Sequence, residues 1–68
     1  MKESDYAPHQ LRVIEEKKEL DMKLFNLSNF LFSEKFEELE MSDKHLLNSQ
    51  FDIMRRYSEI LETRIKNF

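Results

Sequence analysis

The sequence predicts an all-α protein in which two long antiparallel helices are joined by a short helix. The chain of 68 residues has no glycine and one proline, and it combines 40% hydrophobic with 37% charged residues. This mixture is typical of long amphipathic helices. Apolar residues also recur at steps of three and four, which is the period of one helix face. Together these observations predict a single helical domain over residues 1–68.

The first long helix is expected at residues 8–28, after a polar, flexible segment at residues 1–7. Pro8 suits the first turn of a helix, where its missing N–H costs nothing, and Ser4 or Asp5 is expected to cap that turn. Alternating steps of four and three indicate a heptad seam along this helix. The seam consists of Tyr6, Gln10, Val13, Lys17, Leu20, Leu24, Leu27 and Leu31.

The connection between the long helices is expected to contain a short helix at residues 30–39. A cluster of Asn26, Ser28 and Asn29 places a joint just before it. We expect four phenylalanines to form a core beneath the connection, namely Phe25, Phe30, Phe32 and Phe36. The last helix is expected at residues 43–67, with Ser42 as its N-cap.

The last helix has a wider apolar face than one partner helix can cover. One seam at steps of three and four comprises Leu47, Gln50, Met54, Tyr57, Leu61, Arg64 and Phe68. A second stripe runs through Leu46, Ile53 and Ile60. A chain this short rarely stabilises itself with one core, and this one has no cysteine for a disulfide. The surplus stripe therefore predicts association with other subunits into a helical oligomer.

Polar residues interrupt the two seams at Gln10, Lys17, Gln50 and Arg64. These side chains can reach the rim or pair with nearby acids, of which Glu16, Glu19 and Glu62 are candidates. They can also fix the register of the helices. A second interpretation is that subunit junctions leave small polar pockets lined by Lys and Arg, which would suit a compact anion.

The composition argues against several classes of function. No thiol is present, and His9 and His45 lie too far apart in sequence for a metal motif, so we expect no metal, no cofactor and no catalysis. The formal charge of −3 and the pI of about 5.3 argue against binding to nucleic acid polymers. The apolar runs are too short to span a membrane.

Tyr6, His9 and Arg12 lie three residues apart, on one side of the first turns. Such a group is often solvated surface. A functional version would stack a base on Tyr6 or His9 and place Arg12 against a phosphate.

Two strings of residues resemble a known family. The first runs from Pro8 to Leu20 as PHQLRVIEEKKEL and is followed by Lys23. The second is LLxxQxxxMxxYSxILxxRI, from Leu46 to Ile65. In this order and in so short a chain, they resemble the second anti-CBASS family of small phage proteins. Members of that family are sponges that sequester the cyclic oligonucleotide signals of a bacterial immune system.

The resemblance implies a helical hexamer in the cytoplasm of the infected host. Its members hold cyclic dinucleotides in pockets between subunits and cyclic trinucleotides in a separate class of pocket, and they bind without cleaving. The dinucleotide site would use Lys23, with Lys17 as competitor, and Tyr6 or His9 as the stacking residue. Arg12 would lie near that site. The trinucleotide site would use Arg64.

A structural or adaptor protein is the alternative function. In that case a helical oligomer would bind another protein through its apolar stripe, and Lys17 and Arg64 would only fix the register of the helices.

Overall fold

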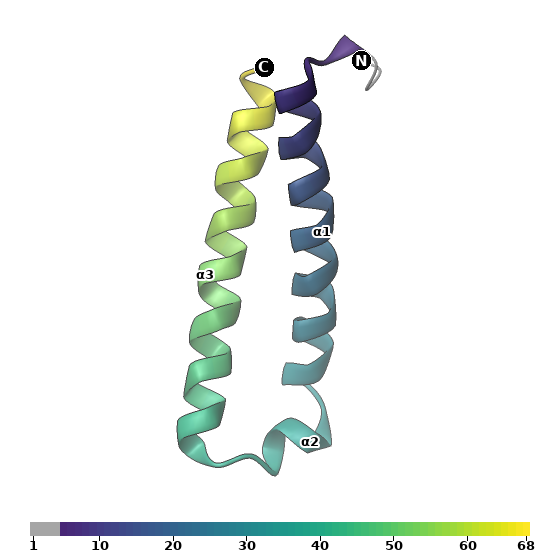
Figure 1. Ribbon diagram of the computed structural model, residues 1–68. Helices are drawn as coiled ribbons and strands as arrows, with labels where there is room; N and C mark the ends of the chain where they lie inside the picture. Colours follow the sequence, from purple (N-terminus) through teal and green to yellow (C-terminus); the bar gives the residue numbers. More distant parts are fainter. Residues whose placement is uncertain (1–4) are drawn as a thin grey trace.

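The computed structural model describes residues 5–68, which form a helical hairpin (Figure 1). Its helices are α1 (Pro8–Leu31), α2 (Glu34–Glu37) and α3 (Met41–Lys66). The long helices α1 and α3 run antiparallel, α2 lies at the turn, and the start of α1 meets the end of α3 at the opposite end (Figure 1). The hairpin measures 47 × 16 × 14 Å. Within residues 5–68 no strand occurs, so the predicted all-α class is confirmed.

The side chain of Gln10 caps the first turn of α1. Ala7 is the N-cap residue, and its backbone N–H donates to the side-chain oxygen Oε1 of Gln10 at 2.8 Å. Asp5 therefore does not cap the helix as expected, and Ser4 lies outside the described residues. Residues 1–4, the first part of the segment expected to be flexible, also lie outside the described residues. Tyr6 and Ala7 of that segment are half-buried, because the chain here packs against the end of α3.

The joint after α1 lies later than expected. The helix continues to Leu31 instead of ending at residue 28, and Leu27 and Leu31 of the predicted seam are half-buried in its last turn. Packing thus outweighs the weak helix preference of the Asn and Ser residues here. The predicted short helix 30–39 is reduced to Glu34–Glu37, and Ser33 caps it by accepting a hydrogen bond from the Phe36 N–H at 3.2 Å.

The core beneath the connection is smaller than expected. Phe36 is buried, and its ring meets that of Phe30 edge to face at 6.2 Å. The ammonium of Lys44 lies 5.8 Å from the centroid of the Phe36 ring. Phe25 and Phe32 are 68% and 89% exposed, so their predicted burial is wrong. Phe25 follows Leu24, which turns it about 100° from the seam, and Phe32 lies beyond the end of α1.

The helix α3 begins at Met41, earlier than the predicted residue 43. Glu40 and not Ser42 is the N-cap, since the Glu40 carbonyl already accepts a hydrogen bond from the Lys44 N–H at 3.0 Å. A capping side chain contributes only about 1 kcal/mol, so its presence in a sequence does not fix where a helix starts. The helix ends at Lys66 rather than at residue 67.

The contact between α1 and α3 follows the predicted seam on α1 but another register on α3. Every residue of the α1 seam is buried or half-buried. On α3, the residues Gln50, Tyr57 and Arg64 of the predicted seam are exposed. The inner seam, which faces α1, consists instead of Leu47, Phe51, Met54, Ser58, Leu61 and Ile65. Phe51 and Ile65 are more apolar than the polar residues that they replace, and a hydrogen bond makes the burial of Ser58 possible.

A second heptad seam on α3 remains uncovered. This outer seam consists of Leu46, Gln50, Ile53, Tyr57, Ile60 and Arg64, all of which are exposed. Leu46, Ile53 and Ile60 are 65%, 66% and 58% exposed, as the surplus stripe in the sequence predicted. Among the described residues, no helix combines the length and the apolar character needed to cross a membrane.

Candidate functional site

A polar network joins α1 to α3 along one edge of their interface. The ammonium of Lys17 lies 2.6 Å from Asp21 Oδ2 and 3.9 Å from Glu62 Oε1. The hydroxyl of Ser58 donates to Asp21 Oδ1 at 2.5 Å. Lys17 therefore pairs with Glu62 as expected, and with Asp21 rather than with its neighbours in sequence. The network gives the polar seam residue Lys17 a partner on each helix.

These contacts favour the ionised form of Asp21. The hydrogen bond from Lys17 lowers the pKa of the Asp21 carboxyl below its ordinary value of 3.8, and the hydrogen bond from Ser58 lowers it further. Desolvation acts in the opposite direction and is outweighed. The folded hairpin therefore favours the carboxylate form of Asp21 over the acid.

Acid should weaken the hairpin through this carboxylate. Because the pKa of Asp21 is lower in the folded than in the unfolded chain, its stabilisation is complete above about pH 5 and is lost as the pH falls through the unfolded and then the folded value. We expect Asp21→Asn to be less stable than the wild type at pH 6 and to lose less stability between pH 4 and pH 2. Urea unfolding followed by circular dichroism measures both. The exposed Glu15→Gln is the control, and equal acid sensitivity of Asp21→Asn and wild type would contradict the expectation.

The same edge contains an open hollow of about 340 Å³, here called the Tyr6 hollow. It is formed by the segment before α1, by α1 and by α3, through Tyr6, Ile14, Lys17, Lys18, Asp21, Glu62 and Ile65. An aromatic ring, two aliphatic side chains and two lysines thus share one concave surface with two carboxylates. Such a surface can stack a flat ring and can place an ammonium near a phosphate.

The structure divides the five residues predicted for a dinucleotide site into two groups. Tyr6 and Lys17 line the Tyr6 hollow. His9, Arg12 and Lys23 are exposed on another face of α1. Arg12 and Lys23 are eleven residues apart, which is close to three helical turns, so they lie on the same face.

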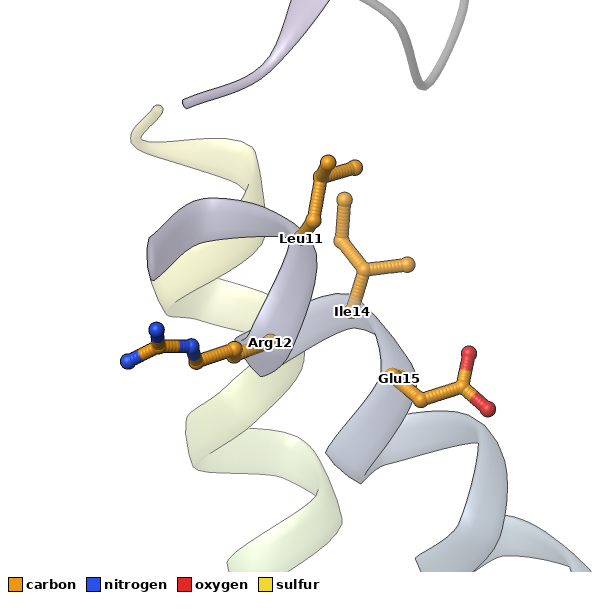
Figure 2. Close-up of a pocket in the computed structure, with 4 residues that line it drawn as sticks. All are labelled: Leu11, Arg12, Ile14 and Glu15. Atoms are coloured by element: carbon orange, nitrogen blue, oxygen red, sulfur yellow. The ribbon is translucent and has the colours of Figure 1, made fainter. Parts of the chain in front are cut away.

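This second group lies toward the opposite edge of the hairpin. There the hydroxyl of Tyr57, on the outer seam, donates to the carboxylate of Glu16, one turn after Arg12. Arg12 also lines a hollow of about 290 Å³ with Leu11, Ile14 and Glu15, and of these residues Ile14 lines the Tyr6 hollow as well. Figure 2 shows the guanidinium of Arg12 pointing away from the side chains of Leu11 and Ile14. Within residues 5–68, neither Arg12 nor Lys23 makes an ion pair, so both cations are available to a ligand.

Arg64 lines a third hollow, of about 390 Å³, on the exposed surface of α3. Arg56, Glu59, Ile60 and Thr63 complete it. Arg56 is already held by Asp52, with 3.3 Å between Nε and Oδ2. Arg64 makes no ion pair within the described residues, and it lies on the outer seam, not in the interface with α1. Its guanidinium is therefore free to bind an anion.

The sequence did not reveal Asp21 and Ser58 as members of the polar network. The spacing of four between Lys17 and Asp21 is a recognisable helical pair. Ser58 is 37 residues from its partner Asp21, so only the fold brings the two together. Among residues 5–68, no three His, Asp or Glu side chains converge as a metal site requires.

Comparisons with known proteins identify the family of this chain. The family model described as Sequestin matches residues 7–67. A protein of Enterobacteria phage T4, described as an uncharacterized 7.5 kDa protein in the denB-rIIB intergenic region, is 45% identical over 60 residues, which cover 88% of this chain and 94% of that protein. No solved structure matches the chain. These matches confirm the resemblance to phage sequestering proteins, and the chain belongs to the Sequestin family.

Proposed function

We propose that the protein binds and sequesters the cyclic di- and trinucleotide second messengers of bacterial CBASS immunity, without cleaving them. The observation that carries this proposal is the Sequestin match over residues 7–67. The site supports it chemically, since cyclic oligonucleotides combine phosphates with flat bases, and the chain offers Tyr6 for stacking and free cations for phosphates. The place of action is the cytoplasm of the infected host, where these signals arise.

The dinucleotide site would form between subunits. The Tyr6 hollow contains a stacking ring, but the ammonium of Lys17 is already paired with Asp21 and Glu62. The unpaired Lys23 lies on another face of α1 and does not line that hollow. A neighbouring subunit can bring its own Lys23, Arg12 or His9 to the hollow. A site completed by two copies explains why the predicted residues are divided between two faces.

The subunits would associate through the outer seam, in the proposed hexamer. Leu46, Ile53 and Ile60 on this seam expose a continuous apolar stripe that a packed helix would bury. Arg64 lies at the end of the same seam. When copies meet there, several guanidinium groups gather, and an anion with matching symmetry relieves their repulsion. This arrangement would hold a cyclic trinucleotide apart from the dinucleotide sites.

Calorimetric titration with a panel of cyclic di- and trinucleotides tests the proposal. We expect saturable binding, and we expect mass spectrometry of the recovered ligand to find it intact. A ligand at 100 times its dissociation constant should also stabilise the fold by about 2.7 kcal/mol. Recovery of linear oligonucleotides would show that the protein cleaves the ligand and is an enzyme. A folded oligomer that binds none of the panel would favour the structural or adaptor function.

Replacing Lys23 by alanine should weaken dinucleotide binding by about 1.5–3 kcal/mol, the contribution of a charge-assisted hydrogen bond. Trinucleotide binding should change little, because Lys23 and Arg64 lie on different helices. Calorimetry on the assembled variant measures both. Lys35→Ala, which removes an exposed lysine in α2, is the control. Unchanged dinucleotide affinity in Lys23→Ala would remove this residue from the site.

Replacing Arg64 by alanine should reduce trinucleotide binding and leave dinucleotide binding intact. The affinity of the wild type for the cyclic trinucleotide should fall as the salt concentration rises, because exposed cations bind the phosphates. Lys66→Ala, an exposed cation two residues further along α3, is the matched control. If Arg64→Ala dissociates the oligomer, Arg64 serves assembly instead. If it abolishes both ligands equally in an intact oligomer, the protein has one class of pocket.

A further inference from the structure

We infer that Phe68 is a positioning residue that holds the ring of Tyr6 in place for stacking on a base of the cyclic dinucleotide. This inference rests on the proposed function. The rings of Tyr6 and Phe68 meet edge to face, with centroids 5.9 Å apart and planes at 66°. The contact joins the segment before α1 to Phe68, the second residue after the end of α3.

Tyr6 needs such support because it lies outside the helices. It precedes the N-cap residue Ala7, so its backbone is not part of α1. If the ring becomes ordered only when the ligand binds, this ordering reduces the binding free energy. The edge-to-face contact with Phe68 orders the ring before the ligand binds, and such pairs are stabilising beyond the area that they bury.

Phe68 itself is held at a defined place. Its backbone N–H donates to the carbonyl of Ile65 at 3.2 Å, and Asn67 donates to the carbonyl of Thr63 at 3.1 Å. Ile65 also lines the Tyr6 hollow, so Phe68 is fixed to a wall of the site. The sequence pattern placed Phe68 in a helix seam, whereas the structure pairs it with Tyr6.

The geometry of the pair leaves room for a base. In an edge-to-face contact, the edge of one ring lies against a single face of the other ring. At least one face of the Tyr6 ring is therefore not covered by Phe68. Phe68 is not among the residues that line the Tyr6 hollow, although Tyr6 is. Phe68 therefore acts through Tyr6, and its removal should affect the dinucleotide site but not the hollow that contains Arg64.

A double-mutant cycle of Phe68→Leu and Tyr6→Leu tests the inference, with cyclic dinucleotide affinity measured by calorimetry on the assembled protein. Phe68→Leu keeps an apolar side chain and removes the ring. It should raise the dissociation constant about threefold to tenfold. Phe68→Tyr, which keeps a ring, should restore it. In the Tyr6→Leu background, Phe68→Leu should have no further effect.

Two further measurements separate positioning from a merely structural role. In Phe68→Leu the NMR chemical shifts of the Tyr6 ring protons should change, because the ring current of Phe68 is lost. The chemical shifts of the Tyr57 ring protons should not change. The affinity for cyclic trinucleotide should also stay unchanged.

The inference is overturned if Phe68→Leu leaves the dinucleotide affinity unchanged, if the two substitutions act additively, or if trinucleotide binding falls equally. Each of these results would leave the proposed function intact. If the wild type binds no cyclic dinucleotide, the proposed dinucleotide site fails, and the role of Phe68 fails with it.

Discussion

Replacing Leu61 by alanine is expected to reduce the free energy of unfolding by about 3 kcal/mol. Leu61 is 0% exposed, and it lies on the inner seam of α3, in the last part of that helix. A single core in a chain this short supplies only about 3–5 kcal/mol. The substitution should therefore leave the hairpin only marginally stable unless association compensates. Urea unfolding followed by far-UV circular dichroism, at several protein concentrations, measures the loss.

The matched control is Leu61→Met, which nearly conserves volume and should cost less than about 1.5 kcal/mol. If Leu61→Ala and Leu61→Met are equally stable, the site can collapse around the smaller side chain. The full burial of Leu61 would then contribute little to the stability of the hairpin.

Replacing Ile53 by aspartate should dissociate the proposed oligomer into monomers. Ile53 is 66% exposed in the single chain, so the charge costs the isolated hairpin little. In an oligomer joined through the outer seam, the same carboxylate would be buried without a partner, at a cost of several kcal/mol. Sedimentation velocity at micromolar concentration measures the effect. Binding of cyclic oligonucleotides should be lost in parallel, because both proposed sites need more than one copy.

Asn48→Asp is the control for this substitution. Asn48 is exposed on α3, away from the outer seam, and the variant introduces the same charge at the opposite edge of the helix. It should sediment like the wild type. A wild type that sediments as a single folded monomer would refute the oligomer and with it the two shared sites. Dissociation by Asn48→Asp as well would show that charge alone, and not the outer seam, controls assembly.

The sequence alone determined the order of two long helices with a short helix between them, and the face of α1 that becomes buried, but not where each helix begins and ends. The period of a helix face is visible in short stretches of sequence, and the steps of three and four from Tyr6 to Leu31 predicted residues that are all buried or half-buried. The same periodicity predicted that Leu46, Ile53 and Ile60 would lie outside the hairpin core. The two strings of helical sequence suggested the family that the comparisons then confirmed.

The tertiary structure decided which residues meet across the hairpin. On α3 the seam that contacts α1 contains Ser58 and not Tyr57, a choice between adjacent residues that depends on the rotation of α3 against α1. The pairs Asp21–Ser58 and Tyr6–Phe68 join residues far apart in the chain. Periodicity repeats within a few residues, so it identifies the faces of a helix. Only the packing of the two helices fixes their relative rotation and axial position, and therefore which side chains form each hollow.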